Sequence, residues 1–85
     1  MIYFKAPWCG PCRMTSPIVE QLQSESETTG VEVEIVNVDE NQDLAAEYGI
    51  RSIPTFVFLK DGEEVDRKVG GLQKPQLLEK FNTLK

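Results

Sequence analysis

The hexapeptide PWCGPC, residues 7–12, contains both cysteines of the chain and its only tryptophan. A cysteine thiolate attacks disulfides and binds soft metals, so two thiols separated by two residues suit three kinds of chemistry. The pair can close a structural disulfide, supply ligands to a metal, or cycle between dithiol and disulfide. The spacing and the surrounding residues bear on each of these possibilities.

A structural role and a metal role both fit the sequence poorly. A bridge between Cys9 and Cys12 closes a very short loop, and the stabilisation from a disulfide grows with loop length. A structural zinc site needs four nitrogen or sulfur ligands, whereas the chain has two cysteines and no histidine. We therefore predict no metal site within one chain, while a metal shared by two chains and a buried, inert pair stay open.

The residues between and after the cysteines favour a redox couple. Proline is tolerated in the first turn of a helix, so Gly10-Pro11 predicts a helix that starts at the pair and leaves Cys9 at its N-terminal edge. Free N–H groups and the helix dipole favour a thiolate there. We predict that Cys9 attacks a target disulfide and that Cys12, one turn inside and less exposed, attacks Cys9 to release the target.

Hydrophobic periodicity predicts the elements that must position this pair, in the order β-α-β-α-β-β-α. The expected strands are 2–6, 31–39 and a hairpin over 55–69 around Asp61-Gly62, and the expected helices run from Gly10-Pro11 to Gly30, from Asn41 to Gly49, and from about Pro75. The apolar positions expected in the core are Met14, Ile18, Val19 and Leu22 on the first helix and Leu77, Leu78, Phe81 and Leu84 on the last.

This order predicts an α/β fold with a four-stranded mixed sheet and three helices on its two faces. Two strands joined by a helix should be parallel, with a right-handed crossover. The cysteine loop would then lie at the C-terminal end of the first strand, where open α/β sheets tend to place their ligand sites.

Composition limits the possible partners. The 85 residues, 40% apolar and 27% charged, fit a single domain over residues 1–85. The net charge of −5 disfavours nucleic acid and anionic membrane surfaces. The first residues lack the layout of a signal peptide, and no apolar run approaches the roughly 20 residues of a spanning helix. We expect a cytoplasmic protein with no nucleic-acid or membrane partner.

The motif WCGPC, the stretch YGIRSIPTFVFLKDGE at 48–63 and the VGG at 69–71 together resemble thioredoxin, over all 85 residues. The resemblance implies a thioredoxin-like fold and a protein-disulfide reductase. Such an enzyme binds no cofactor and carries electrons through a reversible Cys9–Cys12 disulfide. The implied partners are disulfide-containing target proteins and a thioredoxin reductase, which passes on electrons from NADPH.

The resemblance also implies roles for residues around the pair, although each also has an ordinary structural explanation. Trp8 matches the tryptophan that partly covers the site, and Asp39 matches the acid that holds its indole N–H. Ile53-Pro54 matches the bond before the family's cis-proline, which lies beside the cysteines. Gly10 would let a partner backbone approach, and Pro11 would stiffen the turn. The implied substrate-binding residues are Trp8, Ile53, Pro54, Val69, Gly70 and Gly71.

Two departures from the family pattern lie close to the cysteines. Tyr3 stands where the family has a buried aspartate thought to move the proton of the inner thiol, and Ile35 replaces its lysine partner. A tyrosine titrates near pH 10, so we expect water or the outgoing Cys9 thiolate to accept that proton. Lys5 stands where the family often has an aromatic residue. It is either a solvated lysine or a cation near the sulfurs that favours the thiolate.

A third departure concerns the sheet. Thioredoxins normally begin with an extra strand and helix, whereas this sequence starts at the strand that leads into the cysteines. We therefore expect the strand around residues 31–38 to form an exposed sheet edge, with Glu32 and Glu34 discouraging edge pairing. We expect the chain to be a monomer.

Two other functions remain open. A glutaredoxin-like reductase served by glutathione would share the fold size and the glycine pair. However, that family favours C-P-Y-C over C-G-P-C and usually has an aspartate where Leu72 and Gln73 follow. The absence of histidine between the cysteines favours a reductase over an oxidase or isomerase. The chain could also serve as a binding subunit of a larger complex, with no use for its thiols.

Overall fold

The computed structural model describes residues 1–84. At Thr29 and Leu84 it describes the backbone but not the side chain. Its elements, in chain order, are β1 (Ile2–Lys5), α1 (Cys12–Ser24), α2 (Ser26–Thr29), β2 (Glu34–Asn37), α3 (Gln42–Glu47), β3 (Thr55–Lys60), β4 (Glu63–Val69) and α4 (Lys74–Leu84). The predicted order of strands and long helices is confirmed.

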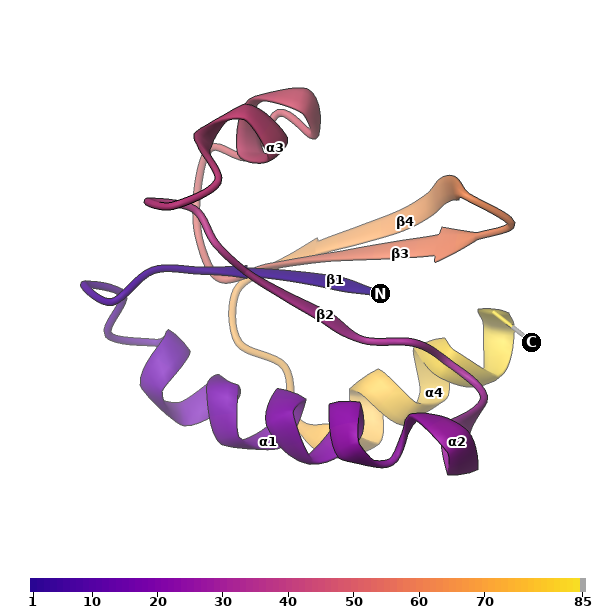
Figure 1. The fold of residues 1–85 in the computed structure, drawn as a ribbon. Coiled ribbons are helices and arrows are strands. Elements are labelled where there is room, and N and C mark those ends of the chain that lie inside the picture. Colours follow the sequence, from indigo (N-terminus) through magenta and orange to yellow (C-terminus); the bar gives the residue numbers. More distant parts are fainter. Residues whose placement is uncertain (85) are drawn as a thin grey trace.

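The four strands form one mixed sheet in the order β2-β1-β3-β4. Strand β1 is parallel to β2 and antiparallel to β3, and β3 pairs with β4 as a hairpin. Helices α1 and α4 lie on one face of the sheet and α3 lies on the other (Figure 1). The structure therefore confirms the mixed four-stranded sheet with helices on both faces.

The prediction of three helices is wrong, because the chain forms a fourth, short helix. Helix α1 ends at Ser24, Glu25 leaves the helical conformation, and α2 adds one turn before Gly30, which has a φ of 76°. The segment from Ser24 to Thr29 is rich in hydroxyl side chains, which compete with the backbone for hydrogen bonds. Ser24 Oγ indeed donates to the Gln21 carbonyl, 2.7 Å away.

Strand β2 is also shorter than the predicted 31–39. Only the stretch opposite the four residues of β1 forms a ladder, with Glu34 beside Ile2 and Asn37 beside Lys5. The alternation of buried and exposed side chains inferred from the sequence nevertheless begins before this ladder, since Val31 and Val33 are buried. The length of β2 is therefore limited by its neighbour.

The sheet separates two apolar clusters. Tyr3, Val19, Phe56 and Leu77 belong to the larger one, between the sheet and helices α1 and α4. The smaller cluster, on the α3 side, contains Ile2, Phe4, Val36 and Val57.

Met14 is wrongly predicted to be in the core, because 79% of its surface is exposed. Thr15 takes the buried position, and its hydroxyl is satisfied by the Pro11 carbonyl at 3.2 Å. The prediction for the Leu84 side chain lies outside the described residues.

The β3–β4 turn forms at Asp61-Gly62, as predicted. Both residues have positive φ values, 54° and 83°, as a tight two-residue hairpin turn requires. The strand β4 ends at Val69, directly before the glycine pair.

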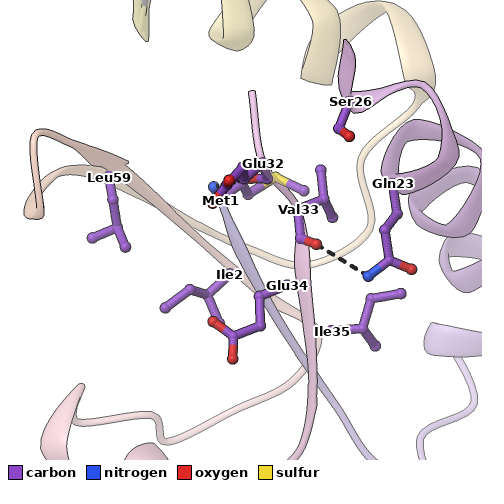
Figure 2. A pocket seen from close by; sticks show the side chains of 9 residues that line it. All are labelled: Met1, Ile2, Gln23, Ser26, Glu32, Val33, Glu34, Ile35 and Leu59. Atoms are coloured by element: carbon purple, nitrogen blue, oxygen red, sulfur yellow. Dashed lines mark hydrogen bonds between the residues drawn. The ribbon is translucent and has the colours of Figure 1, made fainter. Parts of the chain in front are cut away.

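Strand β2 forms one edge of the sheet, as expected. Figure 2 shows the hollow at its N-terminal end, where Ile2, Glu34 and Leu59 lie on one side of the strands and Val33 and Ile35 on the side of α1. Gln23 Nε2 donates to the edge carbonyl of Val33 at 3.1 Å. This hollow lies where β1 begins, whereas the cysteines follow the end of β1.

We expect Leu77→Ala to lower the free energy of unfolding by about 2–5 kcal/mol. Leu77 is fully buried where α4 packs on the sheet, so the change would leave a cavity. Urea unfolding followed by circular dichroism would measure the loss, with the exposed Asn82→Ala as the control on the same helix. Equal unfolding midpoints for the two variants would contradict the packing of α4 described above.

Candidate active site

The two cysteines lie in the loop after β1 and at the first residue of α1. The Cys9 N–H donates to the Ala6 carbonyl at 3.1 Å, which closes the loop tightly. Cys12 is the first residue of α1, and its backbone N–H donates to Cys9 Sγ at 3.2 Å. A disulfide joins the two side chains. Because a backbone donor points at Cys9 Sγ, a thiolate at that atom would receive a charge-assisted hydrogen bond.

The expected difference in exposure between the two cysteines is absent in the disulfide form. Cys9 is 4% and Cys12 is 3% exposed. Both belong to one small apolar cluster with Ala6, against which Val38 and Ile53 pack. The hydrogen bond from the Cys12 N–H, rather than exposure, therefore distinguishes Cys9 from its partner.

The segment before β3 brings Ile53 against the cysteine cluster. The Ile53–Pro54 peptide bond is cis, and Pro54 is buried. The Gly70 N–H donates to the Pro54 carbonyl at 2.8 Å, and Thr55 Oγ1 donates to the Ser52 carbonyl. The first bond holds the segment before β3 against the chain after β4, and the second closes the turn that leads into β3.

Trp8 projects from the loop and is held at its indole nitrogen. Its Nε1–H donates to Asp39 Oδ2 at 3.1 Å and lies 3.3 Å from Oδ1. Asp39 is itself positioned in a turn, where its N–H donates to Asn37 Oδ1 at 2.9 Å. The side chain of Trp8 remains 69% exposed, so its ring offers an apolar surface next to Cys9.

The last residue of β4 and the glycine pair after it form a second apolar surface near α1. Val69 is 61% exposed, and Gly70 has a φ of 102°, which residues with a side chain rarely adopt. A Cβ at Gly71 would lie 3.3 Å from Thr15 Oγ1, so this glycine permits close approach to α1. The structure thus joins the glycine pair to the helix that carries Cys12.

Tyr3 is buried beneath α1, and it remains neutral near pH 7. Its ring stacks on Phe56 at a centroid distance of 5.0 Å, and its hydroxyl lies 3.1 Å from Ser16 Oγ. Burial raises the pKa of Tyr3 above its ordinary value near 10, with a smaller contribution from Glu20, while the hydrogen bond to Ser16 opposes the shift. Tyr3 therefore provides no carboxylate-like base at neutral pH.

A hollow of about 340 Å³ opens beside the disulfide. Besides both cysteines, the polar residues that line it are Lys5, Arg13, Ser16 and Asn37. Of these four, the sequence drew attention only to Lys5. Arg13 and Ser16 follow Cys12 on α1 and could have been found from helical spacing. Asn37 could not, because its place depends on the pairing of β2 with Lys5.

Within residues 1–84, no three histidine, cysteine, aspartate or glutamate side chains are grouped so that they could hold a metal ion. Nor does any helix in that range have the length and apolar character needed to cross a membrane.

A mixed four-stranded sheet of this topology, with a disulfide-bonded cysteine pair at the start of its first helix, is the arrangement of a thiol-disulfide oxidoreductase. The thioredoxin family model matches residues 1–83. Thioredoxin from Pyropia yezoensis is 48% identical over 82 residues, which cover 96% of this chain and 76% of that protein. Thioredoxin 1 from Synechococcus elongatus is 48% identical over 77 residues, covering 91% and 71%.

Solved structures give the same assignment. The N21Q mutant thioredoxin from Halobacterium salinarum superposes with a TM-score of 0.87 at 42% identity, covering 98% of this chain and 71% of that one. Fasciola hepatica thioredoxin gives a TM-score of 0.86 at 45% identity, with 99% and 78% covered. The chain belongs to the thioredoxin family. It is a protein-disulfide oxidoreductase that works through a redox-active disulfide.

We expect stability to fall at high pH because of Tyr3. Its pKa is higher in the folded than in the unfolded state, so its stabilising contribution is complete below about pH 10 and is lost as the pH rises further. Tyr3→Phe should remove this part of the slope, cost about 0.5–1.5 kcal/mol at pH 7 through the lost hydrogen bond, and leave disulfide exchange at pH 7 unchanged.

Urea unfolding at several pH values between 7 and 11 measures this slope. Tyr48→Phe is the matched control, and it should keep the slope because Tyr3 is still present. A Tyr3→Phe protein with the full slope of the parent protein would contradict the assignment.

Asp39→Ala should free the indole of Trp8. The variant removes both acceptor oxygens, so the ring should rotate faster and its fluorescence anisotropy should decrease. The signal reports on this side chain alone, because the chain has one tryptophan. Asp39→Asn keeps one acceptor oxygen and should retain most of the anisotropy. Equal anisotropy in the parent protein and Asp39→Ala would argue against the hydrogen bond.

Proposed function

We propose that residues 1–85 act as a single, monomeric domain in the cytoplasm, which reduces disulfides of target proteins and is itself reduced by a thioredoxin reductase. The observation that carries the proposal is the hydrogen bond from the Cys12 N–H to Cys9 Sγ at the start of α1. It supports Cys9 as the attacking thiolate, and the disulfide supports Cys12 as the residue that attacks Cys9 in the second step.

The exchange takes place in two steps. The Cys9 thiolate attacks one sulfur of the target disulfide, the target S–S bond breaks, and the other target sulfur leaves as a thiolate. The Cys12 thiolate then attacks Cys9 Sγ, and the second target sulfur leaves. Two electrons have passed to the target, and the Cys9–Cys12 disulfide remains for the reductase to reduce.

The proton of Cys12 must be removed before the second step. Because the pKa of Tyr3 is raised, its neutral hydroxyl is unsuited to this task near pH 7. We assign the proton to water or to a departing thiolate. Lys5 lines the hollow beside both sulfurs, so its charge favours the thiolate form of the pair.

Targets would dock on the surface formed by Trp8, Ile53, Pro54, Val69, Gly70 and Gly71. Trp8 and Val69 are both largely exposed and offer apolar surface. The Pro54 carbonyl is occupied by the Gly70 N–H, but the backbone N–H and C=O of Ile53 make no hydrogen bond within residues 1–84. An extended target segment can therefore pair with the Ile53 backbone.

A coupled assay tests the function. We expect reduction of insulin disulfides with NADPH and a thioredoxin reductase, and none with NADPH, glutathione and glutathione reductase. Cys9→Ser should abolish turnover. Cys12→Ser should also lose turnover but accumulate a mixed disulfide with the target, visible by mass spectrometry.

Turnover with glutathione alone would instead assign a glutaredoxin-like function. If neither system nor dithiothreitol drives insulin reduction, the reductase proposal is wrong. Retention of a binding partner by Cys9→Ser/Cys12→Ser would then indicate a binding subunit.

A further inference from the structure

The hollow that contains Lys5 and Arg13 differs in charge from the rest of the molecule. Its lining includes these two cations and no aspartate or glutamate, although the chain carries a net charge of −5. By contrast, the hollow at the β2 edge is lined by Glu32 and Glu34. The disulfide thus lies beside a locally positive surface on an acidic protein.

Both cations are available to a ligand. Neither Lys5 nor Arg13 has a carboxylate within ion-pair distance among the described residues, whereas Arg67, Lys74 and Lys80 all form ion pairs. Lys5 is half-buried, which strengthens its attraction for an anion compared with a fully exposed lysine. Arg13 is exposed at the other wall of the hollow.

Asn37 adds a neutral donor. Its Oδ1 accepts the Asp39 N–H, which orients the amide and leaves Nδ2 without a hydrogen bond in residues 1–84. Asp39, the acidic residue closest to Asn37 in the sequence, holds Trp8 and does not line the hollow. Three free donor groups from β1, α1 and β2 therefore surround a space beside the two sulfurs, with no acidic side chain in its wall.

We propose that this hollow is a carboxylate subsite, which favours disulfides that carry an acidic group close to the sulfur under attack. The proposal rests on the reductase function proposed above and specifies its substrates. Lys5 and Arg13 bind the carboxylate, and Asn37 donates an additional hydrogen bond. The carboxylate belongs either to an Asp or Glu side chain of a protein target or to a small disulfide such as glutathione disulfide.

Three disulfide peptides that differ only in one residue beside a cysteine, Glu, Gln or Lys, test the subsite. The second-order rate constant for reduction by the pre-reduced protein is measured by chromatography of quenched samples, so no reductase is needed. We expect the Glu peptide to react about two to five times faster than the Gln peptide, and the Lys peptide to be slowest. Raising the salt concentration should reduce the Glu preference of the parent protein.

Substitutions then test which residues cause the preference for the Glu peptide. Lys5→Gln and Arg13→Gln should each reduce the ratio of the Glu to the Gln rate, and the double variant should bring it close to one. Lys60→Gln, which makes the same change in net charge at the exposed end of β3, should keep the ratio. Because a change in thiolate content alters all three rates together, the ratio reports on recognition of the carboxylate alone.

Small disulfides identify the source of the carboxylate. Glutathione disulfide is compared with the uncharged bis(2-hydroxyethyl) disulfide in the parent protein and in the double variant. A ratio that falls only for the peptides supports a protein carboxylate, and one that falls only for the small disulfides supports glutathione disulfide.

Two results would overturn the subsite. One is an equal rate for the Glu and Gln peptides in the parent protein together with a small-disulfide ratio that is unchanged in the double variant, and the other is an equal loss of preference in Lys60→Gln. Failure to reduce even the Gln peptide would instead reject the reductase function itself.

Discussion

The structure depends on a strand of four residues that is enclosed on every side. Strand β1 pairs with β2 on one side and with β3 on the other, and its residues Ile2, Tyr3 and Phe4 are buried alternately in the two apolar clusters. A strand held in this way has no freedom to shift its register, because a slip of one residue would exchange its two faces. The position at which β1 ends is therefore fixed, and the cysteine loop starts there.

Hydrogen bonds from β1 and from the residue after it fix the position of the segments that form the site. The Lys5 carbonyl accepts the Val38 N–H and the Ala6 carbonyl accepts the Cys9 N–H, so the turns after β1 and β2 are set by the same strand. Tyr3 links β1 to α1 through Ser16, four residues after Cys12. Both cysteines are thus positioned from β1, one by the loop and the other by the helix packed on the strand.

Much of this arrangement could be predicted from the sequence, wherever a residue type favours a single local conformation of the backbone. Asp61-Gly62 predicts its hairpin because few residues adopt two consecutive positive φ values. The cysteine spacing, with Gly10-Pro11, predicts the helix start. The exposed position of Met14 was missed because Thr15, a polar residue, is buried with its hydroxyl bonded to the Pro11 carbonyl, and hydropathy cannot show such a partner. The positive hollow was also missed, since it depends on the register that sets Asn37 beside Lys5.

Around the disulfide, burial and local charge have opposite effects on the stability of a thiolate. The apolar cluster of Ala6, Val38 and Ile53 disfavours a charged sulfur, since burial penalises an anion. The Cys12 N–H acts in the opposite direction, and in the proposed mechanism the charge of Lys5 in the adjacent hollow does so as well. Tyr3, which is buried and bonded to Ser16 on the helix that carries Cys12, is neutral near pH 7 and adds no negative charge to this balance. A phenol at position 3 therefore provides no base at neutral pH, and it adds no negative charge that would oppose a thiolate or the carboxylate of the proposed subsite.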